Sequence, residues 1–427
     1  MQAFAGFHRA AVGSVPVLWR HDARFKTFRL ALLLRRPLDG RAAARALLPD
    51  LLLQGTARDP SRSALMRRME SLYGGFAVPA VSKHGETHVL QATADSVAGQ
   101  FLPDGPDQMR ACLALLADIL HRPRLDGAGF PADVFAREQK NQANAVRAEF
   151  DDKATYARRQ ALALACEGEP MAIPEHGGLP AILVLKREDP ERARQDFLVR
   201  GQALLMAMGA LPDDLLDTVA GWLADLPAPA PEPVPDAVVV PPRPRRATLE
   251  RADIQQSKLV MVFRFPPASR TAWPARRLFA NLLGGGPHAR LFKEVREKRS
   301  LAYSIAAGVD HHKGLLTIAA GLDETAADTV EALVHAEIAN LQAGRFAATE
   351  LQTAKAGIVS GLTAVDDSIA ARLTFTFERW LEGVDREPAA QAQVYAEVAA
   401  PAVAAAGAGL WLDHVYLLAP ASTKETS

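Results

Sequence analysis

ARLFKEVREKRSLAYSIAAGVDHHKGLLTIAAGLDET, residues 289–325, is the segment that decides the fold, because its outline occurs a second time in the chain. The earlier copy is SALMRRMESLYGGFAVPAVSKHGETHVLQATADS, residues 63–96. Both open with a basic amphipathic helix that ends in Ser-Leu, and a Tyr follows one or two residues after the Leu. Both continue into two strands joined by a turn that contains Lys, His and Gly. An acidic cap and a long helix then follow. The shared order indicates a diverged duplication of one α/β unit.

A proline-rich stretch separates the two copies. LPAPAPEPVPDAVVVPPRPRR, residues 226–246, holds eight prolines. Proline lacks an amide donor and has a fixed φ, so this composition favours an extended linker over helix or sheet interior. We therefore predict an N-terminal domain at residues 1–225, a linker at 226–247 and a C-terminal domain at 248–420, both domains being of ordinary size.

The apolar patterns predict strands and helices in each half. Strands are expected at residues 27–34 (TFRLALLL) and 258–265 (KLVMVFRF), and amphipathic helices at 106–120 and 327–341. A glycine turn that joins two strands as a hairpin favours an α+β fold over a doubly wound parallel sheet. We expect two homologous α/β sandwich domains.

The bulk composition excludes several classes of protein. The 427 residues carry 49 basic and 49 acidic side chains, so the composition does not point to nucleic acid or an anionic membrane as a partner. Cys112 and Cys166 are far apart, and we expect both to be small core residues rather than a disulfide or metal ligands. The sequence shows neither a signal peptide nor an apolar run of about 18 residues, so a cytoplasmic protein is expected.

The stretch VREKRSLAYS, residues 295–304, preceded by LLGGGPHARLF, residues 282–292, resembles the second domain of the insulinase (pitrilysin-like) zinc peptidases. Those proteins carry an Arg and a Tyr seven residues apart, which here are Arg296 and Tyr303. The first half agrees, with FKTFRLALLLRRPL at residues 25–38 and LLLQGT at 51–56. The resemblance covers nearly the whole chain and implies two insulinase-like domains.

The metal motif of that superfamily is missing. It is His-x-x-Glu-His on a helix, in which two His bind zinc and the Glu acts as a base. In this chain the motif falls on ALLPD, so the ligand and base positions hold Ala46, Pro49 and Asp50. Counting back from Asp151 places the distal ligand at Ala145, with Glu138 and Glu149 as alternatives. These residues cannot hold zinc in a three-ligand site, and Pro49 suits the first turn of a helix or a kink.

A narrower resemblance is to the inactive subunit of bacterial two-subunit insulinase-like peptidases. One set of such subunits is associated with modification of elongation factor P. The resemblance implies a zinc-bearing sibling, a shared peptide chamber, and Arg296 and Tyr303 supplied to the zinc site of the sibling. It also suggests that Gly284, Gly285 and Gly286 steer substrate, although these glycines also suit a plain loop before a helix. No cofactor is expected in this chain itself.

Two other stretches carry polar side chains of interest. In KHGETH, residues 83–88, His84, Glu86 and His88 would share one face of a continuous strand and could bind zinc. The glycine between them favours a hairpin turn instead, which would splay the set. Asp151 and Asp152 precede a helical run, where an N-cap is the expected role and a partner contact the alternative.

Two functions of different classes remain open. The chain is either a non-catalytic subunit of a zinc endopeptidase or a scaffold or peptide-binding protein of the same fold without a role in proteolysis. The expected ligand is a peptide or unfolded protein, and both a heterodimer with the zinc-bearing sibling and a homodimer are open. Catalysis by Ser-His-Asp or Cys-His has no local signature in the sequence.

Overall fold

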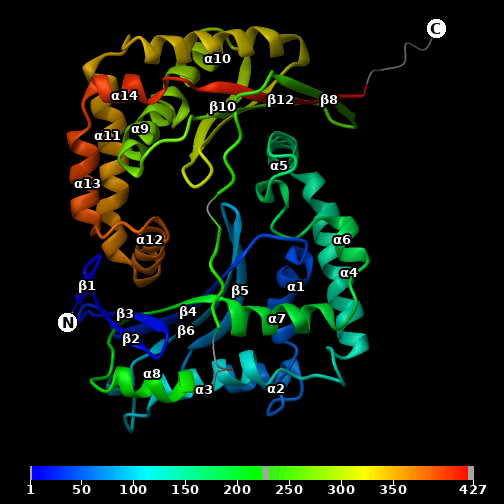
Figure 1. The fold of residues 1–427 in the computed structure, drawn as a ribbon, viewed down its shortest axis with the longest axis vertical. Helices are drawn as coiled ribbons and strands as arrows, with labels where there is room; N and C mark the ends of the chain where they lie inside the picture. The colour runs from blue at the N-terminus through cyan, green and yellow to red at the C-terminus, as the bar shows by residue number, and fades with distance from the viewer. Residues whose placement is uncertain (1, 225–229, 236, 422–427) are drawn as a thin grey trace. The chain divides into compact units, whose positions relative to one another are not determined.

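The computed structural model describes residues 2–224, 230–235 and 237–421. The chain divides into two compact units, and each unit combines three separate stretches of sequence. The first unit comprises residues 1–147, 173–236 and 365–387, and the second comprises 148–172, 237–364 and 388–427. Each unit contains one β-sheet with helices on it (Figure 1).

The sheet of the first unit has the strand order β1-β2-β3-β7-β4-β6-β5. Strands β3 and β7 are parallel, whereas the other neighbours are antiparallel. The strands are β1 (Gln2–Phe4), β2 (Phe7–Val12), β3 (Val15–His21), β4 (Thr27–Pro37), β5 (Phe76–His84), β6 (Thr87–Val97) and β7 (Gln202–Gly209). The helices are α1 (Ala42–Leu52), α2 (Arg62–Glu70), α3 (Gln108–His121), α4 (Ala132–Ala148), α6 (Leu179–Leu183), α7 (Asp189–Arg200), α8 (Leu215–Ala224) and α12 (Ile369–Glu382).

The sheet of the second unit repeats this topology. Its order is β10-β11-β9-β12-β8, again with one parallel pair, β12 and β8. The strands are β8 (Arg246–Ala252), β9 (Ser257–Arg264), β10 (Ala302–Asp310), β11 (Leu315–Leu322) and β12 (Trp411–Pro420). The helices are α5 (Lys153–Ala165), α9 (Trp273–Gly284), the π-helix η5 (Phe292–Glu297), α10 (Ala327–Gln342), α11 (Ala348–Thr363), α13 (Pro388–Glu397) and α14 (Ala400–Ala406). The order β3-β7-β4-β6-β5 thus matches β8-β12-β9-β11-β10, which is the topology expected of a duplication.

Both faces of each sheet are covered, which explains the continuous apolar runs. Along β4, alternate side chains such as Leu30 and Leu32 pack with α1 and α3, while Leu33 packs with α12 on the other face. Along β9, Met261 packs with α9 and α10, while Val262 packs with α5. Figure 1 shows α12 and α3 on opposite faces of the first sheet, and α10 and α5 on opposite faces of the second. Strands buried on both faces lose the alternation that a half-exposed strand shows.

The covering helices exchange between the halves of the sequence, so the units do not follow the predicted boundaries at residues 1–225 and 248–420. Helix α5 precedes the proline-rich stretch but covers the second sheet, and α12 follows it but covers the first. An amphipathic pattern shows that a helix has an apolar face, but not which sheet that face contacts. Residues 225–229 and 236 of the predicted linker lie outside the described residues. The described parts of 230–245 contain no helix or strand, and β8 starts at Arg246.

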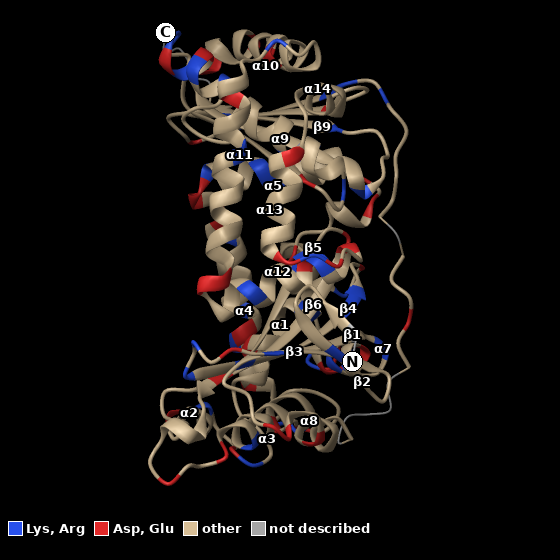
Figure 2. Ribbon diagram, turned by 90° about the vertical axis from the view of Figure 1, so that its left-hand side faces the viewer, with Lys and Arg blue, Asp and Glu red and all other residues tan. Residues whose placement is uncertain are grey.

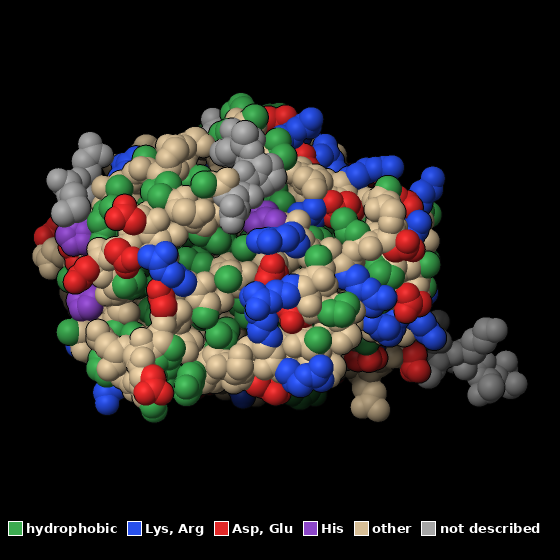
Figure 3. Space-filling view, turned by 90° about the horizontal axis from the view of Figure 1, so that it is seen from below, with side chains coloured by type: hydrophobic (Ala, Val, Ile, Leu, Met, Phe, Trp, Pro, Cys, Tyr) green, Lys and Arg blue, Asp and Glu red, His purple; other side chains and the backbone are tan. Residues whose placement is uncertain are grey.

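The strands and helices expected from periodicity are present, with each end no more than three residues from its predicted position. Short 3₁₀ turns connect them: η1 (Gly99–Phe101), η2 (Glu149–Asp151), η3 (Pro170–Ala172), η4 (Arg270–Ala272), η6 (Glu324–Ala326) and η7 (Ala364–Asp367). Cys112 and Cys166 are both buried and are not joined by a disulfide. Among the described residues, no helix combines the length and apolarity needed to cross a bilayer. Acidic and basic residues occur along both units (Figure 2) and are interspersed over the face seen in Figure 3.

Candidate functional site

The lost metal motif lies on α1, beside the edge strand β5. Pro49 is the eighth of the eleven residues of α1. It therefore does not lie in the first turn of the helix, which was one of the two positions that the sequence suggested. At this position proline removes the bond that its amide would donate to the Arg45 carbonyl, at a typical cost of about 3 kcal/mol. The helix nevertheless continues to Leu52, and the amide of Leu53 donates to the Pro49 carbonyl at 3.3 Å.

Glu138, on α4, is the acidic residue whose charge acts on Asp50. The pKa of Asp50 is raised, first because the surrounding protein keeps water from its carboxylate and second because Glu138 repels its negative charge. Glu138 is buried, whereas Ala145 is exposed further along the same helix. Glu149 belongs to the other unit and pairs there with Arg159. The structure therefore favours Glu138 over Ala145 as the residue at the position of the distal metal ligand, facing the degenerate motif on α1.

The residues around Asp50 do not fit zinc. Glu138 already accepts hydrogen bonds from Arg137 (Nε to Oε1, 2.9 Å) and from Asn141 (Nδ2 to Oε2, 2.9 Å). Arg137 also donates to Gln54 at 2.9 Å, and Gln54 donates to the Asp50 carbonyl of α1 at 3.1 Å, so polar contacts link α4 to α1. With no imidazole at residue 46 or 50, only a pair of repelling carboxylates remains. No group of three or more potential ligands is arranged to hold a metal ion in the described ranges.

The KHGETH stretch forms the hairpin turn between β5 and β6, not a metal site. Gly85 has φ of 56° and lies between the paired residues His84 and Thr87. The His84 ring contacts Glu378 on α12, with Nδ1 3.2 Å from Oε1. The His88 side chain is fully buried, and burial lowers its pKa to about 4. The turn thus splays the set, as the glycine predicted.

The segment that carries Arg296 and Tyr303 is irregular at three consecutive places. Residues 292–297 form a π-helix, Ser300 has φ of 52°, and the ladder between β10 and β11 shifts register at Tyr303. Helix η5 lies against β10, which is an edge strand of the second sheet. π-helices, strained residues and bulges are frequent at functional sites, where they re-aim side chains. Here the bulge makes Tyr303 the extra residue of the strand.

Both side chains point away from the core of the second unit. Tyr303 is 61% exposed, and in the described part of the chain its hydroxyl makes no hydrogen bond. Arg296 is exposed and lies over the Phe292 ring, with Cζ 4.7 Å from the ring centroid. Its guanidinium forms no ion pair with a described residue. Neither polar side chain therefore has a hydrogen bond or an ion pair with a described residue that would explain its position.

The three glycines of the GGGPH stretch have different environments. Gly284 ends α9 and is buried against β10, where an added Cβ would come within 2.6 Å of the Ala307 amide nitrogen. Close packing explains why residue 284 is a glycine. Its burial leaves it without the access to substrate that the sequence analysis expected. Gly285 and Gly286 line a cavity of about 170 Å³ together with His288 and residues of α11. Only these two glycines keep a potential role in binding.

Asp152 is the N-cap of α5, which is the role that the sequence predicted. Its carboxylate caps α5 by accepting from the amides of Ala154 and Thr155, both at 3.1 Å. The Thr155 hydroxyl also donates to it, and these bonds lower the pKa of Asp152.

Comparison with known proteins identifies the class. Residues 185–358 match the family described as Peptidase M16 inactive domain. The chain has the two-domain fold of M16-like, or insulinase-like, proteins, and these matches confirm the resemblance seen in the sequence.

Three similar proteins illustrate the match, and the two solved structures among them share the fold. A protein described as probable inactive metalloprotease YmfF, from Bacillus subtilis (strain 168), is 25% identical over 369 residues, covering 83% of this chain and 84% of that protein. A conserved protein from Enterococcus faecalis V583 has the same fold, with a TM-score of 0.90, 23% identity and coverage of 97% and 98%. A peptidase M16 inactive domain from Pseudomonas fluorescens has a TM-score of 0.80, 19% identity and 98% coverage of both chains.

Proposed function

We propose that this chain is the non-catalytic subunit of a heterodimeric zinc metallopeptidase. The zinc would belong to an M16-type sibling, and this chain would line the peptide chamber and supply Arg296 and Tyr303. The observation that carries the proposal is the exposed Tyr303, which lies at a bulge on an edge strand and has no hydrogen-bond partner among the described residues. The degenerate motif on α1 supports it, because the described residues hold no group of side chains arranged to bind a metal ion.

The chemistry of the pair suits peptide hydrolysis. A tyrosine hydroxyl can donate to the scissile carbonyl oxygen as negative charge develops on it in the transition state. An arginine can donate two parallel hydrogen bonds to a peptide backbone or carboxylate. The Arg296 guanidinium lies over the Phe292 ring while its side chain stays exposed. The proposal places the two subunits in the cytoplasm, as the sequence suggested.

The test is to reconstitute the chain with a zinc-bearing sibling and measure hydrolysis of unfolded peptides. We expect no activity from this chain alone and a large gain on mixing. Tyr303→Phe should lower kcat of the complex by about 100-fold, the scale of losing one oxyanion donor. Tyr73→Phe is the matched control, because Tyr73 is the exposed tyrosine at the corresponding place of the first copy.

Two outcomes would change the assignment. If Tyr303→Phe leaves kcat unchanged in an active complex, Tyr303 has no part in the chemistry. If a stable complex forms and no peptide is cut, the chain is a scaffold or peptide-binding protein of this fold. A zinc content near one per chain in the purified protein alone would overturn the non-catalytic role altogether.

A further inference from the structure

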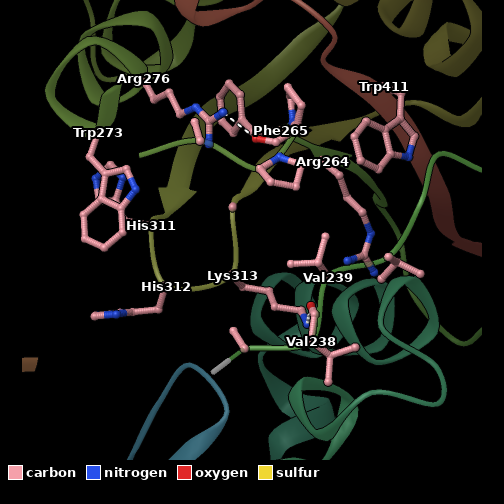
Figure 4. Close-up of a pocket in the computed structure, with 16 residues that line it drawn as sticks. Val238, Val239, Arg264, Phe265, Trp273, Arg276, His311, His312, Lys313 and Trp411 are labelled. Atoms are coloured by element: carbon pink, nitrogen blue, oxygen red, sulfur yellow. Dashed lines mark hydrogen bonds between the residues drawn. The ribbon is translucent and has the colours of Figure 1, made fainter. Parts of the chain in front are cut away.

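A cavity of about 200 Å³ lies in the second unit, at the turn between β10 and β11 (Figure 4). Its lining is largely aromatic, proline and aliphatic, and comes from residues 237–240, 264–268 and 311–314 together with Trp273, Arg276 and Trp411. Eight residues of extended strand separate Tyr303 from His311, which corresponds to about 26 Å. The cavity is therefore a separate place from the Arg296 and Tyr303 segment.

Arg276, on α9, is a buried cation with no carboxylate partner among the described residues. The residue is 7% exposed and is not ion-paired within the described part of the chain. Its Nη2 donates to the Pro266 carbonyl at 2.5 Å, and its Cζ lies 4.7 Å from the Phe265 ring centroid. Its Nε is buried and finds no acceptor among the described residues. Burial of the charge lowers the pKa of Arg276, and such a charge is costly unless an anion balances it.

Two other cations that line the cavity are balanced. Arg264 donates to Asp413 and Glu169, each at 2.5 Å. Lys313 is also paired with Glu169, at 2.5 Å. Carboxylates of the chain thus balance these two cations of the cavity. Arg276 differs from them because no described carboxylate pairs with it.

A second orphaned donor lines the same cavity. The indole Nε1 of Trp411 is buried and has no acceptor in the described residues. The rings of Phe265, Trp273 and Trp411 and the neighbouring prolines provide an apolar surface around these donors (Figure 4). Ligand sites typically combine such apolar walls with a few polar anchors, although sites for drug-sized molecules are larger, at about 300–1,000 Å³. The cavity suits a ligand about the size of one amino-acid residue.

We propose that this cavity binds a small apolar carboxylate, whose charged group pairs with the Arg276 guanidinium. The apolar part of the ligand contacts the aromatic and proline lining. The carboxylate comes either from a free organic acid or from the C-terminus of a peptide. Because a guanidinium binds a carboxylate through charge-assisted and directional hydrogen bonds, the neutral amide of the same ligand binds much less tightly.

Isothermal titration of the intact chain tests the site with three probes: 4-methylpentanoate, the peptide acetyl-Gly-Ala-Leu with a free C-terminus, and the same peptide as its amide. We expect saturable binding of at least one acid and ~10–100-fold weaker binding of the amide. Binding of the peptide acid alone identifies a peptide C-terminus as the ligand, and binding of 4-methylpentanoate alone identifies a free acid. Equal binding of peptide acid and amide, or no saturable binding of either acid, overturns the proposal.

Two variants locate the binding. Arg276→Gln should weaken binding of the acid by at least ~10-fold, while Arg277→Gln, the exposed neighbour on α9, should leave it unchanged. Unchanged affinity in Arg276→Gln would overturn the role of Arg276. If that variant does not fold, Trp411→Phe removes only the indole donor and should weaken the acid several-fold, and wild-type affinity in Trp411→Phe would overturn the site. The proposed peptidase role can fail without affecting these titrations, which need no partner.

Discussion

Asp413→Asn should destabilise the second unit, because one fully buried carboxylate balances three arginines. Asp413 accepts hydrogen bonds from Arg243 at 2.9 and 3.0 Å, from Arg246 at 3.1 Å and from Arg264 at 2.5 Å. These arginines come from the start of β8, the residues just before it, and the end of β9. Asparagine keeps the shape of the side chain but removes its charge and turns an amide N–H₂ toward the donors.

The size of the loss follows from what remains after the substitution. Breaking a buried ion pair typically costs about 3–5 kcal/mol. The lower value applies, because the side chains of Arg243 and Arg246 keep 27% and 31% exposure and Arg264 keeps Glu169. About 3 kcal/mol corresponds to a fall in Tm of roughly 6–12 °C for a unit of this size.

The effect should also depend on pH. Burial by itself would raise the pKa of Asp413, but the hydrogen bonds from Arg243 and Arg264 and the arginine charges outweigh it, and the pKa is lowered. A lowered carboxyl pKa stabilises the folded state above the unfolded value of about 3.9, and this contribution is lost as the pH falls through the folded pKa. The wild-type advantage over the variant should therefore shrink below about pH 4.

Urea and thermal unfolding of both proteins, followed by circular dichroism, measure the difference. Asp253→Asn is the matched control, because Asp253 is exposed in the same unit and forms no ion pair with a described residue. The control should change the free energy of unfolding by less than about 0.5 kcal/mol. A loss below about 1 kcal/mol in Asp413→Asn would refute the view that this carboxylate holds β8 and β9 together.

Two further predictions concern the first unit. Restoring His-x-x-Glu-His at residues 46–50 should produce a chain that binds about one zinc by elemental mass spectrometry, and adding Glu138→Gln should weaken that binding; equal zinc content in both variants would exclude Glu138 as the distal position. Burial and neighbouring positive charge lower the pKa of His88 to about 4, so the folded state binds fewer protons than the unfolded state between about pH 4 and 6.5. The free energy of unfolding should then fall on acidification by up to ~1.4 kcal/mol per pH unit, and urea titrations of His88→Gln should lack this component; an identical slope in that variant would contradict it.

The repeated order of signals in the sequence was enough to predict two sandwich units, because hairpins and buried strands leave local patterns. The apolar runs at residues 27–34 and 258–265 became β4 and β9, central strands that are buried on both faces. The exchange of α5 and α12 left no such pattern. Both helices have an apolar side, and the choice of sheet is made by contacts between residues far apart in the sequence.

The candidate site was predicted in part for similar reasons. The loss of two histidines can be read from single residues, whereas Glu138 can be chosen over Ala145 only once α1 and α4 are packed together. The bulge at Tyr303 depends on how β10 pairs with β11, so residue types alone do not predict it. Arg276 and Trp411 come from distant parts of the sequence and meet only at one cavity, and neither belongs to a motif.

The exchanged helices also bear on how the protein can move. The chain passes from one unit to the other after residues 147, 172, 236, 364 and 387. A protein with a single linker can turn its domains about one hinge, whereas this chain would have to bend at five crossings at once. Cutting the backbone in the proline-rich stretch removes only one of those crossings, so each fragment would still carry a helix that completes the core of the other.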